Sequence, residues 1–163
     1  MKSKSLLARR QQAMGPAYRL FYDRPVQLVR GEGAWLYDAG DRRYLDMYNN
    51  VAHVGHEHPD VVRAGQLQMG VLNTNTRYLH ENVIAYAERL GALFPDPLSV
   101  CFFVTSGSEA NELALRMARA HTGRNGVIAI EGGYHGHTQS LIDASHYKHA
   151  GDGGIGAPDW VRT

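Results

Sequence analysis

A strand, a turn and a helix in direct succession are predicted near the middle of the chain. Residues 100–104 form a short apolar run with β-branched and aromatic side chains, which is typical of a strand covered on both faces in a parallel α/β sheet. Gly107 permits a tight turn, and Ser106 and Glu109 have the spacing of a capping box at a helix start. Apolar residues then recur at helical spacing as far as Gly123, a typical helix C-cap.

The turn at the start of this helix predicts an anion-binding site. The unpaired N–H groups of a helix start, together with the helix dipole, bind phosphate or carboxylate. The hydroxyls of Ser106 and Ser108 can add hydrogen-bond donors. A self-capped helix without a ligand would suit the same residues. The chain lacks the Gly-x-x-x-x-Gly-Lys-Ser/Thr pattern, which excludes a nucleotide P-loop.

Composition predicts one soluble globular unit with an ordinary core, since 44% of the 163 residues are hydrophobic and 20% are charged. The formal net charge of +1 gives no electrostatic case for a nucleic-acid or membrane partner. Cys101 is the only cysteine, which excludes an internal disulfide and favours a reducing, cytoplasmic compartment. We expect neither a secretory signal nor a membrane span, because no apolar run is long enough.

Two parts are predicted along the chain, an N-terminal part at residues 1–58 and the start of a larger α/β domain at residues 59–163. The first part comprises a helix at 3–14 and an antiparallel meander of strands at 26–30, 34–37 and 43–48. The second part comprises helices at 59–72, 80–94, 108–122 and 139–144, and strands at 100–104 and 126–130.

The two strands of the second part flank one helix, which predicts a βαβ unit with a right-handed crossover. Ligands bind beyond the carboxyl ends of the strands in open α/β sheets. The turn at residues 106–109 and the loop that contains Tyr134 are therefore expected to face one pocket.

A histidine cluster invites a metal interpretation. His53, His56 and His58 lie close in sequence, in a pattern similar to the His-x-His-x-Asp-His signature of metallo-hydrolases. Val61 occupies the final ligand position, however, and turn or cap hydrogen bonds before Pro59 explain the histidines as well. We predict no metal site and keep a zinc hydrolase as an alternative.

Three motifs together resemble the class III aminotransferases, fold-type I enzymes that use pyridoxal 5'-phosphate. They are Ser-Gly-Ser-Glu-Ala-Asn-Glu at 106–112, Gly-Tyr-His-Gly-His-Thr at 133–138 and the Asn/His-rich stretch at 49–59. The resemblance covers essentially the whole chain but only the N-terminal part of the family. Within the family, the chain is similar to phospho-lyases that act on phosphoethanolamine or phosphohydroxylysine, and to bacterial class III proteins described as aminotransferases.

The resemblance implies a role for each residue of a cofactor site. Gly107 and Ser108 would hold the cofactor phosphate, with Ser106 beside them in the same turn. Tyr134 would stack on the pyridine ring, and His135 would line the pocket next to it. A packed core aromatic is the alternative for Tyr134.

The resemblance also implies a substrate side. Asn49, Asn50 and Val51 would lie there, in a site that the family builds at a homodimer interface; a simple turn is the alternative for Asn50. Arg77 is a candidate for a second phosphate site, because the planar guanidinium binds phosphate oxygens in pairs. A solvated loop arginine is the alternative.

The chain departs from the family in its lysines. Lys2, Lys4 and Lys148 are the only ones, and none lies in the context of the Schiff-base lysine, which the family carries far downstream together with the acid that partners the pyridine nitrogen. No catalytic residue is therefore expected within this chain. The predicted function is amino-group transfer between an amine or amino acid and a keto acid by an enzyme of which this is the front part. A phospho-lyase and a non-catalytic remnant are the alternatives.

Overall fold

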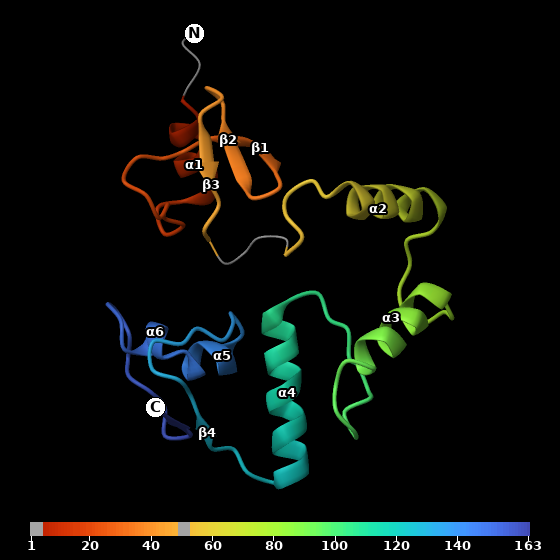
Figure 1. Ribbon diagram of the computed structural model, residues 1–163. Coiled ribbons are helices and arrows are strands. Elements are labelled where there is room, and N and C mark those ends of the chain that lie inside the picture. The colour runs from red at the N-terminus through yellow and green to blue at the C-terminus, as the bar shows by residue number, and fades with distance from the viewer. Residues whose placement is uncertain (1–4, 49–52) are drawn as a thin grey trace. The chain divides into compact units, whose positions relative to one another are not determined.

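The computed structural model describes residues 5–48 and 53–163. The chain divides into two compact units, Met1–Asn75 and Thr76–Thr163. Each unit has its own sheet, a three-stranded one in the first and a two-stranded one in the second (Figure 1). The division falls after residue 75, whereas the sequence suggested a boundary at residue 58; that assignment stays a prediction.

The first unit begins with helix α1 (Leu6–Met14), whose N-cap Ser5 accepts a hydrogen bond from the N–H of Ala8. Strands β1 (Leu28–Glu32), β2 (Trp35–Asp38) and β3 (Arg43–Leu45) follow as an antiparallel sheet in the order β1-β2-β3. Helix α2 (Pro59–Val71) starts with Pro59 at its first position. The predicted helix and meander are confirmed.

The meander is tied to the segment in front of α2 by a carboxylate–imidazole pair. His56 exchanges two backbone hydrogen bonds with Gly33, and its Nε2 lies 2.8 Å from Oδ2 of Asp46. A carboxylate can only accept, so Nε2 is the ring nitrogen that carries the proton. The ring lies against β1, where a Cβ on Gly31 would come within 2.7 Å of the imidazole Cγ. The structural role of His56 is thus to hold the segment in front of α2 to the meander by hydrogen bonds.

The second unit contains helices α3 (Glu81–Gly91) and α4 (Gly107–Thr122), as predicted to within a few residues at each end. Strand β4 (Val127–Ile128), helices α5 (Gln139–Ala144) and α6 (His146–His149) and strand β5 (Val161–Arg162) complete it. β4 and β5 pair in parallel, Val127 opposite Val161, and the connection between them includes α5 and α6.

The predicted strand at residues 100–104 is not formed. The segment has no strand partner among the described residues, and Val100 and Phe102 are 79% and 61% exposed. An isolated extended segment cannot satisfy its backbone groups in a ladder, so apolar composition alone does not make it a strand. The predicted pairing of residues 100–104 with 126–130 in one βαβ unit is therefore wrong for this chain, because β4 pairs with β5.

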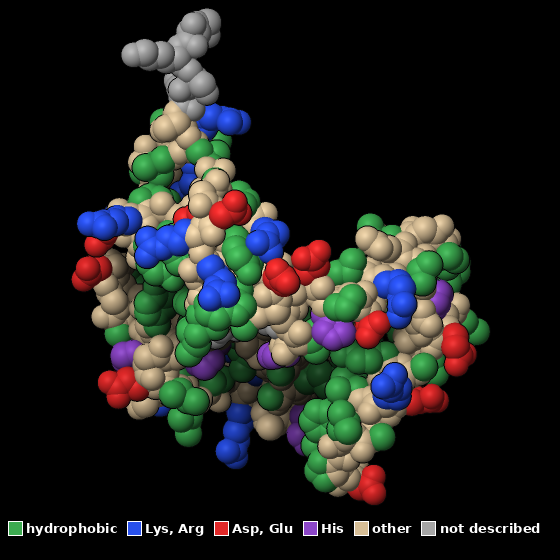
Figure 2. All heavy atoms as spheres, turned by 45° about the horizontal axis from the view of Figure 1, so that its top comes forward, with side chains coloured by type: hydrophobic (Ala, Val, Ile, Leu, Met, Phe, Trp, Pro, Cys, Tyr) green, Lys and Arg blue, Asp and Glu red, His purple; other side chains and the backbone are tan. Residues whose placement is uncertain are grey.

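Buried residues are few and lie within one short part of the second unit. In the described part of the chain, the fully buried side chains are those of Leu141, Ser145 and Val161. Many large apolar side chains are exposed instead, and Figure 2 shows them spread over the visible face. The ordinary core expected from composition is thus not built, because most of the apolar surface finds no cover in this chain.

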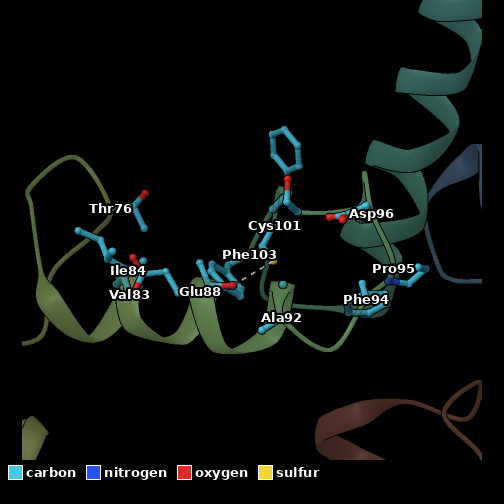
Figure 3. Close-up of a pocket in the computed structure, with 14 residues that line it drawn as sticks. Thr76, Val83, Ile84, Glu88, Ala92, Phe94, Pro95, Asp96, Cys101 and Phe103 are labelled. Carbon is cyan, nitrogen blue, oxygen red and sulfur yellow. Dashed lines mark hydrogen bonds between the residues drawn. The ribbon is translucent and has the colours of Figure 1, made fainter.

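One such apolar surface is a groove between α3 and the extended segment at 99–103. Val83, Ile84 and Phe103 are among the side chains that line it (Figure 3). Phe103 stacks on Tyr86 with ring centroids 5.1 Å apart, and the thiol of Cys101 lies 3.8 Å from the carbonyl oxygen of Ala87. None of the helices in the described residues combines the length and apolar character needed to cross a bilayer.

The Asp46–His56 pair generates a prediction for the first unit. The hydrogen bond from His56 lowers the pKa of Asp46, so the pair stabilises the fold above the ordinary aspartate pKa and this contribution is lost as the pH falls through the lowered value. Asp46→Asn should therefore speed amide exchange at Gly33 and His56 at neutral pH, and the difference from the parent should shrink on acidification.

Asp60→Asn is the matched control, since Asp60 pairs with Arg63 at 2.8 Å on α2 but both side chains are 72% exposed. It should leave exchange at Gly33 and His56 unchanged. Equal exchange rates in Asp46→Asn and the parent at neutral pH would show that the pair does not hold the segment.

Candidate functional site

At the start of α4, side chains of the turn accept hydrogen bonds from backbone N–H groups of the same turn. The hydroxyl of Ser106, the N-cap, accepts a hydrogen bond from the N–H of Glu109 at 3.2 Å. The Glu109 carboxylate turns back and accepts from the N–H of Thr105 at 2.7 Å and from the Thr105 hydroxyl. These hydrogen bonds, the one from the Thr105 hydroxyl first, lower the pKa of Glu109. The turn is thereby fixed before any ligand binds.

Gly107 and Ser108 form the open part of this turn. Their N–H groups belong to the first helical turn, which has no intrahelical acceptors for them. A Cβ placed on Gly107 would meet none of the described atoms within 4 Å, so there is free space beside the backbone here. Ser108 Oγ accepts from the N–H of His137 at 3.0 Å, which leaves the hydroxyl proton available for donation. The turn can thus present three donors to an anion.

The loop with Tyr134 follows β4 and is held by backbone contacts. The N–H of Gly132 donates to Nδ1 of His146 at 3.0 Å, and the N–H of Gly133 donates to the carbonyl of Ile130 at 2.9 Å. Tyr134 meets Tyr147 edge to face, with ring centroids 6.4 Å apart, and is 53% exposed. The ring is therefore placed by its loop and still has surface free for stacking on a flat ligand.

His135 is anchored through its backbone. Its N–H donates to the Oγ of the buried Ser145 at 2.9 Å, and its carbonyl accepts from the side-chain amide of Asn111 at 2.7 Å. The imidazole lies against Gly133, and its Nε2 is buried without a hydrogen-bond partner in the part of the chain that the structure describes. His135 also lines a cavity with Asn111, Leu141 and other residues of α4, β4 and α5.

Gly136 lets this loop approach α4. It is buried, with φ at +146°, a conformation that side-chain-bearing residues rarely adopt. A Cβ there would lie 2.5 Å from Cδ1 of Leu141 and 3.0 Å from the Cα of Ser108. The close approach brings the loop to the helix start.

The structure therefore brings together the predicted cofactor residues of the second unit. Ser106, Gly107 and Ser108 form one end of the site, and the Ser108–His137 hydrogen bond joins it to the loop with Tyr134 and His135. Sequence reasoning missed Asn111, Glu112 and Ser145, which hold this loop. A detectable signal was present, because Ser108, Asn111 and Glu112 are polar at i, i+3 and i+4 and so lie on one side of the helix.

The described structure brings none of the other predicted residues into this arrangement. Asn49, Asn50 and Val51 lie outside the described residues. Arg77 is exposed at the start of the second unit. Lys148 lies in α6, exposed, with Nζ 4.8 Å from the centroid of the Tyr147 ring. Within residues 5–48 and 53–163, no cluster of three His, Cys, Asp or Glu side chains could hold a metal ion.

Comparison with known families shows to which family the chain belongs. The profile of the family described as "Aminotransferase class-III" matches residues 21–157, which is most of the chain. The chain belongs to the class-III aminotransferase family. The turn at residues 106–109, the Tyr134 loop and the whole second unit up to residue 157 lie inside the match.

Relatives within the class-III family include both aminotransferases and lyases. An alanine–glyoxylate aminotransferase 2-like protein of Drosophila melanogaster is 53% identical over 155 residues, which are 94% of this chain and 31% of the relative. A phospholyase from Arthrobacter, solved in complex with phosphoethanolamine, is 46% identical with a TM-score of 0.88 and covers 98% of this chain and 37% of its own. A transaminase solved with PLP bound is 30% identical with a TM-score of 0.71, over 83% of this chain and 33% of its own.

These comparisons fix the fold and the class of protein. The chain has the N-terminal part of the fold-type I architecture, an antiparallel meander followed by parallel α/β structure. It is part of a family of enzymes that depend on pyridoxal phosphate. The chain spans about a third of the length of the relatives it matches.

The contact at Gly136 predicts a large effect of one added methyl group. Gly136→Ala should destabilise the protein by about 1–3 kcal/mol, because the new Cβ overlaps Leu141 and Ser108. Gly126→Ala is the control, since a Cβ at Gly126 meets no described atom within 4 Å and its φ is not positive. Urea unfolding of both variants measures the difference. A Gly136→Ala variant as stable as Gly126→Ala would contradict the close approach.

Proposed function

We propose that this chain is the cofactor-phosphate-binding front part of a pyridoxal-phosphate-dependent class III aminotransferase, which transfers an amino group between an amine or amino acid and a keto acid. One observation carries the proposal. The open turn at Gly107 and Ser108 is joined by the Ser108–His137 hydrogen bond to the loop that presents Tyr134. A helix start with free donors and an exposed aromatic ring thus occur in one compact unit, as a phosphorylated aromatic cofactor requires.

Each residue of the turn has a task that follows from its geometry. The N–H groups of Gly107 and Ser108 and the hydroxyl of Ser108 bind the phosphate, and Ser106 keeps the first turn in shape by capping it. Tyr134 stacks on the pyridine ring, and His135 lines the pocket wall next to it. The bound pyridoxal ring supplies the electron sink for the chemistry.

The reacting groups are proposed to come from the remainder of the complete protein. None of the three lysines of this chain lies near the phosphate turn in sequence, and Lys148 contacts Tyr147 in α6. We place the Schiff-base lysine and the acid that partners the pyridine nitrogen downstream of Thr163. By itself this chain would then bind and orient the cofactor but not turn over substrate.

The wider setting belongs to the same proposal. Asn49, Asn50 and Val51 are assigned to the substrate side, at the interface of a homodimer. The complete enzyme is assigned to the cytoplasm, with a small amine or amino acid as substrate and with neither nucleic acid nor membrane as partner. The single, free Cys101 is compatible with a reducing compartment.

A phospho-lyase is the second candidate function. The observation in its favour is the 46% identity and the TM-score of 0.88 to a phospholyase that was solved with phosphoethanolamine. Such an enzyme must hold the phosphate of its substrate as well as that of the cofactor. Arg77, exposed in a polar loop, is the proposed residue for the second phosphate.

Variants of the phosphate turn and of the aromatic platform test the proposal in the complete protein. Ser108→Ala should weaken binding of pyridoxal phosphate by roughly 1–3 kcal/mol, because it removes a hydrogen bond to a charged group. Tyr134→Ala should weaken binding through lost stacking. Thr122→Ala, at the far end of α4, is the control and should bind as the parent does. Unchanged affinity in both site variants would refute the assignment.

Arg77→Ala separates the two candidate functions. Phosphate release from phosphoethanolamine is measured beside amino transfer from alanine to several keto acids, in parent and variant. An aminotransferase should keep its amino transfer in the variant, since no second phosphate has to be held. Phosphate release by the parent that collapses in Arg77→Ala, while Arg63→Ala retains it, would establish the phospho-lyase instead.

A further inference from the structure

One face of the first two turns of α4 is hydrogen-bonded to the segment 135–140. Ser108, Asn111 and Glu112 are at i, i+3 and i+4, so their side chains leave the helix on the same side. Ser108 accepts from the N–H of His137, and Asn111 donates to the carbonyl of His135 at 2.7 Å. Glu112 accepts from two hydroxyls further along the segment. α4 and α5 lie side by side as a result (Figure 1).

Glu112 is the most informative of these residues. Its half-buried carboxylate accepts from the hydroxyl of Thr138 and, at 3.1 Å, from that of Ser140. Thr138 is the N-cap of α5, yet in the described structure its side chain makes no capping hydrogen bond, and its hydroxyl donates to Glu112. The start of α5 thus lacks its usual side-chain cap while α4 gains a contact to the loop. The stability of α5 alone does not explain why the Thr138 hydroxyl donates to Glu112.

Asn111 acts directly beside the aromatic platform. Its amide donates to the carbonyl of His135, the residue that follows Tyr134. Asparagine is a poor helix former, so its position in the second turn of α4 has a local cost that this contact offsets.

The ring of Tyr134 depends on these bonds for its position. It is 53% exposed, and its one ring contact within the described residues is with Tyr147. The bonds from α4 to residues 135, 137, 138 and 140 all lie on the C-terminal side of the ring, whereas Gly132 and Gly133 hold the other side. The distance between the phosphate turn and the ring is therefore set by the polar face of α4.

We propose that Asn111 and Glu112 are positioning residues that hold Tyr134 at the distance from Gly107 and Ser108 that a ring and its phosphate group require. The inference rests on the proposed function, because it names what sets the geometry of that same site. Asn111 and Glu112 act on the cofactor through Tyr134 and do not touch the phosphate. Phosphate binding by the helix start should therefore survive their replacement, whereas ring stacking should not.

The test uses the complete enzyme freed of cofactor, in the variants Asn111→Ala, Glu112→Ala and Glu112→Gln. Affinity for pyridoxal phosphate should fall about tenfold in the two alanine variants, since each loses hydrogen bonds that place the ring. Glu112→Gln retains an acceptor oxygen and should recover part of the loss. Inhibition of cofactor binding by inorganic phosphate should stay within about twofold of the parent, because the helix start is intact.

Two readouts separate positioning from a merely structural role. The circular dichroism band that the bound cofactor acquires from a fixed ring orientation should weaken in Asn111→Ala and Glu112→Ala even at saturation. Glu112→Ala should also add little to the loss already caused by Tyr134→Ala, since both act through one ring. Asp143→Ala is the control, because it removes a 2.8 Å hydrogen bond that the Asp143 carboxylate accepts from Gln139 within α5 and that does not involve α4.

The possible outcomes are distinct. A parent protein that does not bind pyridoxal phosphate would overturn the proposed function itself. A parent that binds, with Tyr134→Ala weakened but Asn111→Ala and both Glu112 variants unchanged, would overturn only the positioning role. Additive losses in the Glu112→Ala, Tyr134→Ala double variant would also overturn it. Should Glu112→Ala fail to fold, Asn111→Ala carries the test, since Asn111 is exposed.

Discussion

The hydrogen bonds between α4 and the segment 135–140 are the constraint on which the second unit depends. They join a helix start that can bind an anion to a loop that presents an aromatic ring. In the sequence, the rest of α4 and strand β4 lie between these two segments. Gly136 makes the contact possible, because only a residue without a Cβ fits between Leu141 and Ser108. The candidate site is thus a property of this contact rather than of either segment alone.

Many large apolar side chains away from this contact are exposed. The groove between α3 and residues 99–103 and the exposed side chains of Val100 and Phe102 provide area that a larger protein would cover. The relatives of this chain are about three times as long as the matched region. The described residues therefore contain the Ser108–His137 contact at the start of α4 but few buried side chains.

In the first unit, some features follow from neighbouring residues and others depend on residues far apart in the sequence. The meander follows from turn residues and alternation, and the hydrogen bonds from Tyr44, Arg42 and Gly40 to Asp38 lower the pKa of that carboxylate at the β2–β3 turn. The histidine pattern, in contrast, was ambiguous between metal binding and hydrogen bonding. His56 is hydrogen-bonded to Asp46, ten residues earlier, and only the fold of the strands brings the two side chains together.

The sequence by itself determined what depends on neighbouring residues. The cap by Ser106, the left-handed Gly123 that ends α4 and the Pro59 start of α2 were all predicted, because capping and helical periodicity act within one turn or two. Only the tertiary structure decided what depends on a distant partner. Residues 100–104 have no strand partner among the described residues, and β4 pairs with β5. Asn111 and Glu112 are hydrogen-bonded to a loop some two dozen residues away. Strands and side-chain networks form only when both partners are in place.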